Sequence, residues 1–296
     1  MNGGARDFIA FGLRIRSAFD IPGAIAVSDE APVDLTIATG NVPAAGLATD
    51  FPYTLVEDGF VFAAPDVARY QYHANERRIV VDPLPSSDPE MVGALLIATM
   101  LPATIWAQGG FVLHAAAAIP PGGTHAVAIA GPAGSGKSTL LERMIAAGWT
   151  VLGEDSLALE VQGDAVLASG LPGILWLCDT PDRNVRRALP IPPRQQTARA
   201  PLAAILHITT ASTGDETVIV PLLLPQAIET ILGNRHRPGL AWLMRIDAGA
   251  LPAVATFCGR LAIARLTCGN PARIALQHLA ALASSVEGRP EMGTGE

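Results

Sequence analysis

The stretch that most constrains the fold is residues 125–155, HAVAIAGPAGSGKSTLLERMIAAGWTVLGED. Its apolar residues predict a buried strand over 126–130 and an amphipathic helix over 138–147. Between them, residues 131–138 match G-x-x-x-x-G-K-[ST] at every fixed position. Such a loop leaves backbone N–H groups free at a helix N-terminus, where they can surround phosphate oxygens. The segment therefore predicts a nucleotide phosphate site.

The predicted phosphate contacts come from one short run of residues. They are Gly131, Gly134, Ser135, Gly136, Lys137, Ser138 and Thr139. Lys137 is the only lysine in the chain, and every other cation among the 20 is arginine. A compact ammonium can reach the β- and γ-phosphates of a nucleotide, which favours a functional reason for lysine at this position. The alternative is a glycine-rich turn that binds no ligand.

Two acidic residues follow the predicted helix on the next predicted strand. Glu154 and Asp155 lie 17 and 18 positions after Lys137. Carboxylates at such a site can hold Mg²⁺ or accept a proton from an attacking hydroxyl. Because neighbouring residues of a strand point to opposite faces, both acids can serve one site only if the strand ends or twists near Glu154. We predict Ser138 and Asp155 as the Mg²⁺ ligands, and the alternative is that one acid only caps or faces solvent.

The segment before the loop indicates a mixed sheet. Residues 111–119, FVLHAAAAI, are typical of another buried strand, and residues 120–123, PPGG, of a tight turn. The strands on either side of this turn should then pair as an antiparallel hairpin, because parallel strands need a longer crossover connection. The predicted fold class is therefore α/β with a mixed, partly antiparallel sheet.

Charge and cysteine content exclude several kinds of partner. The 296 residues carry a net charge of −7 with a pI near 5.4, whereas binding to nucleic acid or to an anionic membrane needs a basic face. The three cysteines, Cys178, Cys258 and Cys268, have no metal-ligand spacing and are expected as free thiols in a reducing cytoplasm. The N-terminal residues show no apolar region of a signal peptide. We predict a cytoplasmic protein.

One uncharged segment, residues 91–107, approaches the length of a membrane span. Pro102 interrupts this segment, and two threonines lie within it. Asp88 and Pro89 supply an N-cap and a first-turn proline, as in an ordinary helix. A buried core helix is the prediction here, and a membrane span is the less favoured alternative.

Short apolar runs separated by turn residues fill residues 8–82 and predict a small β-rich or α/β unit without recognisable chemistry. We therefore divide the chain into an N-terminal unit over 1–84, a P-loop domain over 85–284 and a disordered tail over 285–296.

Two groups of arginines lie outside the loop. Residues 179–201 are rich in arginine and proline and predict a surface excursion or lid, and residues 235–237, RHR, fall in a second predicted loop. Guanidinium groups suit phosphate or an acidic substrate, and the alternative is a solvated loop. His207 and His278 are expected to be structural.

Together these elements resemble the catalytic core of HPr kinase/phosphorylase, and more closely the HPr-kinase-related serine kinases, some of which phosphorylate ribosomally made peptides such as lasso peptides. In that family a histidine precedes the loop strand by one hairpin and a paired acidic motif follows the loop helix. Here these positions are His114 and Glu154-Asp155. The resemblance is strong over 111–160 and covers roughly 85–284. It implies a fold like that of phosphoenolpyruvate carboxykinase, with ATP and Mg²⁺ as cofactors.

The resemblance also implies a role for each residue. Glu154 would be the general base, Asp155 would work nearer the metal, Lys137 would hold the phosphates, and His114 would contact the γ-phosphate or the acceptor. For His114 the alternative is a hydrogen-bonded core residue. The sequence departs from the family in having glutamate as the first acid, and in lacking a clear second signature and an N-terminal domain like that of HPr kinases. HPr itself and phosphorylase activity are therefore not expected.

The leading hypothesis is an ATP-dependent kinase that transfers the γ-phosphate to a serine hydroxyl of a peptide or small protein, with lasso-type peptides among the acceptors. The alternative is a nucleotide-binding regulatory or assembly module, which needs the phosphate loop but no general base. The resemblance also implies that the chain can form a homo-oligomer.

Overall fold

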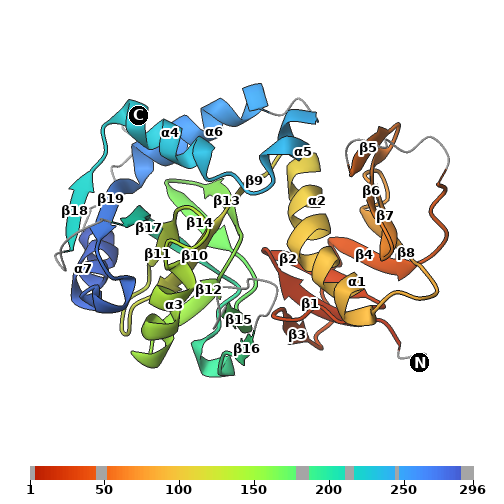
Figure 1. Ribbon diagram of the computed structural model, residues 1–296, viewed down its shortest axis with the longest axis horizontal. Coiled ribbons are helices and arrows are strands. Elements are labelled where there is room, and N and C mark those ends of the chain that lie inside the picture. The colour runs from red at the N-terminus through yellow and green to blue at the C-terminus, as the bar shows by residue number, and fades with distance from the viewer. Residues whose placement is uncertain (1–3, 45–51, 178–186, 211–216, 244–246, 288–296) are drawn as a thin grey trace.

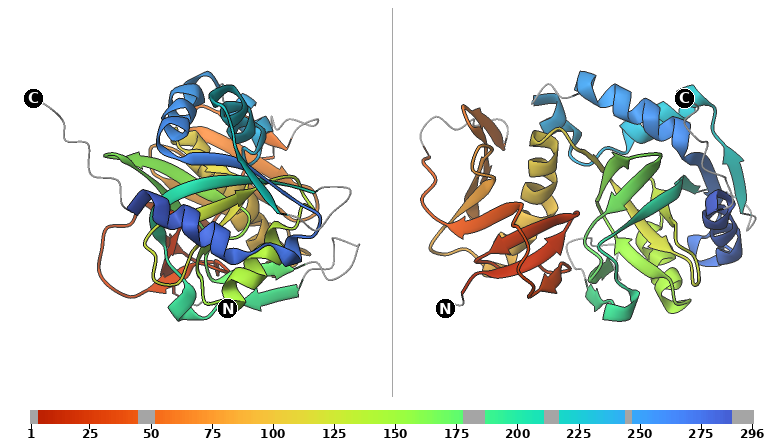
Figure 2. Two further views of the ribbon diagram at one scale, coloured as in Figure 1. Left: turned by 90° about the vertical axis from the view of Figure 1, so that its left-hand side faces the viewer. Right: turned by 180° about the vertical axis from the view of Figure 1, so that it is seen from behind.

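Two large β-sheets lie on either side of a central helical segment in the computed structural model of the protein (Figure 1). The structure describes residues 4–44, 52–177, 187–210, 217–243 and 247–287. Figure 2 shows that most of the remaining helices gather around the second sheet, whereas the short helix Pro238–Leu243 lies beside the central segment. Both sheets contain parallel and antiparallel pairs, which confirms the predicted mixed α/β class.

The first sheet is built from the first third of the chain, in the order β3-β1-β2-β4-β8-β7-β6-β5. Its strands are β1 Arg6–Ala10, β2 Leu13–Ser17, β3 Ile25–Val27, β4 Leu35–Thr39, β5 Tyr53–Val56, β6 Gly59–Ala64, β7 Ala68–His73 and β8 Arg78–Pro83. Phe11 and Gly12, with φ values of 52° and 74°, turn the first apolar run into the β1–β2 hairpin. One apolar core continues from this sheet into the second. The domain boundary at residue 84 stays a prediction.

Strand β7 shows how residue alternation sets this packing. Its burial alternates along ARYQYH, so that Tyr70 and Tyr72 point into the core while the polar residues between them face outward. The Tyr70 hydroxyl donates to the carbonyl of Val92, 2.8 Å away on the central helical segment. The first sheet therefore contacts this segment through the buried tyrosines and through the hydrogen bond of Tyr70.

The central segment consists of α1 Pro89–Leu95, the π-helical turn η1 Leu96–Met100 and α2 Leu101–Ala107. Asp88 caps α1 by accepting from the N–H of Glu90, as predicted. The segment is long and apolar enough to be a candidate membrane span, but 61% of its most apolar window is buried inside the protein. Its position between the two sheets supports the prediction of a core helix (Figure 1).

The second sheet contains nine strands, in the order β12-β10-β11-β17-β14-β13-β9, with β19 joined to β17 and β18 to β19. These strands are β9 Phe111–Leu113, β10 Ala115–Ile119, β11 Ala126–Ala130, β12 Thr150–Gly153, β13 Leu157–Gln162, β14 Ala165–Ser169, β17 Arg199–Thr210, β18 Val218–Pro221 and β19 Ala262–Cys268. Strand β11 pairs antiparallel with β10 and parallel with β17. The predicted hairpin before the phosphate loop is therefore confirmed.

Five helices accompany this sheet: α3 Lys137–Ala146, α4 Leu224–Gly233, α5 Pro238–Leu243, α6 Asp247–Arg260 and α7 Leu276–Glu287. Single 3-10 turns form at η2 Pro193–Gln195 and η3 Pro271–Arg273. Helices α3 and α7 share an apolar core with β11, β17 and β19. Helices α5 and α6 fall in a stretch for which the sequence made no prediction. Cys258 and Cys268 are free thiols, as expected, and Cys178 lies outside the described residues.

Part of the arginine-rich segment predicted as a surface excursion is instead folded against the second sheet. Residues 178–186 lie outside the described part of the chain. After them, β16 Arg187–Pro190 pairs with β15 Ile174–Leu177, and Ile191 is buried. Gln195 is buried as well, and its amide donates to backbone carbonyls at the end of α3. The prediction of a surface excursion is therefore wrong for residues 187–195. It was based on the high arginine and proline content, which gave no sign that Ile191 and Gln195 are buried.

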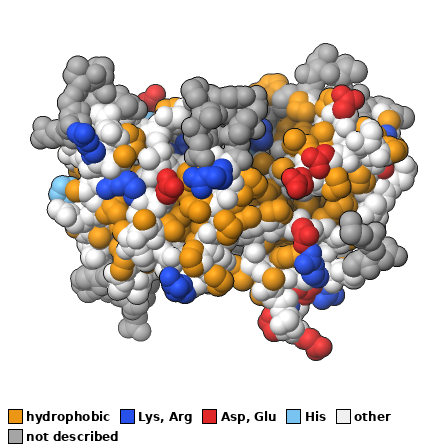
Figure 3. All heavy atoms as spheres, turned by 60° about the horizontal axis from the view of Figure 1, so that its bottom comes forward, with side chains coloured by type: hydrophobic (Ala, Val, Ile, Leu, Met, Phe, Trp, Pro, Cys, Tyr) orange, Lys and Arg blue, Asp and Glu red, His pale blue; other side chains and the backbone are white. Residues whose placement is uncertain are grey.

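Hydrophobic side chains cover much of the molecular face in Figure 3, and charged groups are scattered among them. The composition explains this, because 50% of the residues are hydrophobic and only 16% are charged. Strand β18 and the following turn expose Val218, Val220, Leu223 and Leu224.

Candidate functional site

The predicted phosphate loop connects β11 to α3, as the sequence pattern requires. Gly131, Gly134 and Gly136 take φ values of 145°, 82° and 93°, which residues with a Cβ rarely adopt. A Cβ on Gly131 would lie 2.8 Å from two atoms of Ile208, and one on Gly136 would lie 2.4 Å from Cγ of Pro271. Both conformation and crowding therefore require glycine at these two positions.

Lys137, the first residue of α3, holds its ammonium group over the loop. The side chain is only 8% exposed, and its Nζ donates to the carbonyls of Gly131 at 2.7 Å and Pro132 at 3.2 Å. A buried ammonium needs such hydrogen bonds, because removing a charge from water is costly. A phosphate in the loop would meet this positive charge together with the positive end of the α3 dipole.

The loop also contains a polar atom whose hydrogen-bonding capacity is unused. The Ser135 hydroxyl is buried and has no hydrogen-bond partner among the described residues. Leaving such a group unsatisfied costs about 1–3 kcal/mol, and a phosphate oxygen would satisfy it. Ser138 and Thr139 follow in the first turn of α3, where Ser138 is half-buried and Thr139 is exposed. The loop therefore fits a nucleotide phosphate, and the Ser138 hydroxyl is an oxygen ligand of the kind that Mg²⁺ prefers.

The acid pair lies where strand β12 has just ended. β12 stops at Gly153 and β13 begins at Leu157, so Glu154 and Asp155 occupy the bend between the two strands. The sequence required the strand to end near Glu154 if both acids were to serve one site, and the backbone meets that condition. The Asp155 side chain is 49% exposed, which leaves its carboxylate accessible to a metal ion or a ligand.

His114 interrupts the strand that was predicted over residues 111–119. On its N-terminal side β9 pairs with β13, and on its C-terminal side β10 pairs with β11 and β12. The register places Ala115 opposite Ala130, so His114 lies across from the start of the phosphate loop. The single predicted strand therefore bends between two sets of neighbours at the residue that was singled out as a candidate.

Hydrogen bonds hold both the backbone and the ring of His114. Its N–H donates to the carbonyl of Asn234 at 2.7 Å. Its Nδ1 lies 2.9 Å from the backbone carbonyl of Asp155 and 3.4 Å from Oδ1 of the same residue. A carbonyl oxygen can only accept, so Nδ1 carries the proton in this arrangement. The structure thus joins two of the predicted catalytic residues directly.

His236 is a neighbour of His114 that the sequence did not identify. The two rings have centroids 6.1 Å apart, and one ligand atom each from His114, Asp155 and His236 lie within 4.8 Å of one another. His236 comes from the short RHR segment, for which a solvated loop was the alternative. That alternative is wrong for His236, which is buried and whose backbone N–H donates to the carbonyl of Val112 at 2.9 Å. No spacing rule links residue 236 to residue 114, so only folding could show the pair.

Burial lowers the pKa of both imidazoles. For His114 desolvation is the largest cause, Asp155 opposes it, and the charge of Lys137 adds to it. For His236 desolvation again dominates and lowers the pKa, with Asp155 opposing it and Arg237 adding to it. Both rings therefore favour the neutral form, in which one nitrogen of each carries a lone pair.

His207, which was expected to be structural, also lies near the loop. It pairs with Ala130 in the β11–β17 register, and its Nδ1 lies 3.0 Å from the side-chain amide nitrogen of Asn234. The amide donates, so Nδ1 is the acceptor. Since Asn234 in turn accepts from the N–H of His114, His207 supports the backbone that carries the histidine pair, and this contact favours the structural role.

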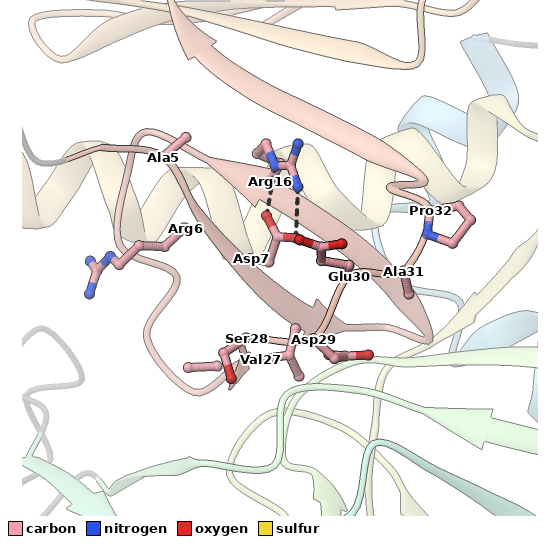
Figure 4. A pocket seen from close by; sticks show the side chains of 11 residues that line it. Ala5, Arg6, Asp7, Arg16, Val27, Ser28, Asp29, Glu30, Ala31 and Pro32 are labelled. Atoms are coloured by element: carbon pink, nitrogen blue, oxygen red, sulfur yellow. Dashed lines mark hydrogen bonds and ion pairs between the residues drawn. The ribbon is translucent and has the colours of Figure 1, made fainter.

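A shallow hollow of about 1050 Å³ lies elsewhere, at the β3 edge of the first sheet (Figure 4). Its charged lining comes from Arg6, Asp7, Arg16, Asp29 and Glu30. Asp7 accepts hydrogen bonds from Arg16, and this pairing lowers the pKa of Asp7. Arg6 pairs with Asp20 and Asp29 with Arg14, and none of the charged lining groups belongs to the phosphate loop or the acid pair. The hollow is therefore not part of the candidate site.

The fold and the loop define a P-loop-containing protein of mixed α/β architecture. No protein-family model matches the sequence, and no curated protein matches it. Among solved structures the chain is similar to the Hpr(Ser) kinase/phosphatase from Coxiella burnetii, with 12% identity and a TM-score of 0.32, over 60% of this chain and 93% of that one. This similarity is distant.

Proposed function

We propose that this protein is a kinase that uses ATP and Mg²⁺ to phosphorylate a serine hydroxyl of a peptide or small protein. One observation carries the proposal. Strand β10 pairs with both β11 and β12, so the phosphate loop after β11 and the acid pair after β12 leave the sheet at the same edge. This arrangement supports a site in which the loop, the acids and His114 would act on the same phosphate, as phosphoryl transfer requires.

The chemistry assigned to these residues is charge neutralisation and proton transfer. Lys137 and the first-turn amides of α3 would stabilise the charge on the phosphate oxygens. Glu154 would take the proton of the serine hydroxyl as its oxygen bonds to the γ-phosphorus and the bond to the β-phosphate oxygen breaks, which releases ADP. Ser138 and Asp155 would hold Mg²⁺, which supplies further charge neutralisation on the phosphates.

The acceptor class rests on the resemblance of residues 111–160 to the HPr-kinase-related serine kinases. The bend that carries Glu154 and Asp155 is only half-buried, so a peptide hydroxyl can approach it. Peptides with serine at their C-terminus, lasso-type peptides included, are the acceptors to test first.

The test is a mass-spectrometric assay of the purified protein with Mg²⁺-ATP and a pool of serine- and threonine-bearing peptides. A gain of one phosphate on particular peptides is expected, and it should be absent for Lys137→Ala. Nucleotide binding without any phosphopeptide, together with a slow ATPase rate that is the same in Glu154→Ala, would contradict the proposal. That result would favour the regulatory or assembly module instead.

A further inference from the structure

We propose that His114, Asp155 and His236 form a binding site for a divalent transition-metal ion, with Zn²⁺, Co²⁺ and Mn²⁺ as the candidate ions. One ring nitrogen of each histidine and one carboxylate oxygen of Asp155 lie within 4.8 Å of one another. They come from the β9–β10 junction, the bend after β12 and the loop after α4. The site shares Asp155 with the predicted Mg²⁺ site, and a carboxylate with two oxygens can bridge two ions.

Each imidazole is oriented by a hydrogen bond from one ring nitrogen to a backbone carbonyl, as is common for metal-binding histidines. The His114 Nδ1–H donates to the carbonyl of Asp155, and the His236 Nε2–H donates to the carbonyl of Ala98 at 3.1 Å. Since carbonyls only accept, these bonds fix both tautomers and leave His114 Nε2 and His236 Nδ1 with a lone pair. Neither of these nitrogens has a hydrogen-bond partner among the residues that the structure describes. A backbone carbonyl on the second nitrogen is the usual orienting contact of a histidine ligand.

The central helical segment explains why Ala98 can accept from His236. In an α-helix its carbonyl would bond to the N–H of residue 102, but that residue is Pro102, which has none. The helix has a π-helical turn at this point, and such turns are frequent at functional sites. The Nε1–H of Trp106, a fully buried residue, also donates to the carbonyl of His236 at 2.9 Å. His236 is therefore fixed at its ring and at its backbone.

The donor set selects the class of ion. Two imidazoles and one carboxylate suit Zn²⁺, Co²⁺ or Mn²⁺, whereas Mg²⁺ prefers oxygen ligands. Three protein ligands leave a coordination position open, as in catalytic rather than structural metal sites. A role for this ion in orienting the γ-phosphate or the acceptor rests on the proposed function, but binding of the ion does not.

The test is a Co²⁺ titration of the chelator-treated, full-length protein without nucleotide, followed by its visible absorption. Wild type should bind one equivalent and show the spectrum of a nitrogen-ligated ion. His236→Gln and His114→Gln should each weaken binding by at least about tenfold, as loss of one ligand or its orienting contact does. His278→Gln removes an exposed histidine of α7 and should bind as wild type does. Thermal unfolding of each variant checks that it is folded.

Two results would overturn the site: no Co²⁺ or Zn²⁺ binding by wild type without nucleotide, or equal affinity in wild type, His114→Gln and His236→Gln. The test of kinase activity is independent of the test of metal binding. Phosphopeptide formed with Mg²⁺-ATP by a protein that binds no Co²⁺ would remove the site and keep the proposed function. If the protein bound one equivalent of Co²⁺ but formed no phosphopeptide, the metal site would stand and the proposed function would be contradicted.

Discussion

The phosphate loop and the histidine–aspartate cluster lie at one edge of the same sheet but are encoded in opposite ways. Eight consecutive residues, 131–138, make the loop. The cluster needs His114, Asp155 and His236, which three separate parts of the chain supply. A local backbone conformation determines the first, and only strand pairing and core packing determine the second.

The two regions are therefore sensitive to different substitutions. The loop depends on glycines with positive φ and on one ammonium group that bonds to its own turn. The cluster depends on contacts between residues far apart in the sequence, such as the hydrogen bond from the His236 ring to the carbonyl of Ala98. Changes within the loop should therefore act on phosphate chemistry, and changes in remote packing should act on the cluster.

The largest expected effect is on turnover, for a variant of the acid that precedes Asp155 in the bend after β12. Glu154→Gln removes the proposed base while keeping the side-chain size, so turnover of a phosphopeptide substrate should fall by about 10²–10⁴-fold. Steady-state kinetics with the best acceptor peptide would measure this. Glu160→Gln, which alters an exposed acid of β13, is the control. Turnover within a few-fold of wild type in Glu154→Gln would show that Glu154 is not the base.

Lys137→Arg tests whether the loop needs an ammonium or only a positive charge. The guanidinium is planar and larger, so it should fit poorly over the loop and turnover should fall by about 10²–10³-fold. Metal titration of the same variant should remain as in wild type, because Lys137 is not among the cluster ligands. Wild-type turnover would mean that lysine stands at this position by chance.

Gly136→Ala tests whether the loop backbone is as constrained as its φ and contacts indicate. The new Cβ would meet Pro271, so the free energy of unfolding should fall by about 1–3 kcal/mol in urea denaturation. Gly122→Ala is the matched control, because Gly122 has a φ of 78° but nothing within 4 Å of the new Cβ. Equal losses in both variants would leave backbone strain as the whole cause and exclude crowding by Pro271.

Pro102→Ala is the corresponding test for the cluster. It restores an N–H that can compete with His236 for the carbonyl of Ala98, so Co²⁺ affinity should fall by about tenfold while the helix itself is not destabilised. Turnover should change less than in Lys137→Arg. A variant with unchanged Co²⁺ affinity would show that the π-helical turn does not position His236.

The smallest expected effect is on the pH dependence of stability. Burial lowers the pKa of His114, His207 and His236, so below the unfolded value of about 6.5 the unfolded chain binds more protons than the folded one. Stability should therefore fall as pH decreases below about 6.5. Urea midpoints between pH 7.5 and 5 should show a shallower decrease in His236→Gln. An identical decrease would mean that His236 can take up a proton in the folded state.

Features that depend only on neighbouring residues could be predicted from the sequence. The glycine pattern predicted the loop, PPGG predicted the β10–β11 hairpin, and Asp88-Pro89 predicted the start of α1, because a turn or a cap needs only local backbone conformations. The end of β12 at Gly153 was a condition that the sequence could state but not decide. The roles of Glu154, Asp155 and His114 stay predictions.

The contacts between distant parts of the chain became visible only in the folded structure. It placed His236 beside His114, split the strand at His114, and folded the segment around Ile191 and Gln195 against the second sheet. No local pattern encodes these contacts, because each depends on which strands pair and on which buried polar groups need a partner. Pro102 is an example. The presence of proline at this position predicts a missing backbone N–H, but only the folded chain shows that the His236 ring donates to the carbonyl of Ala98.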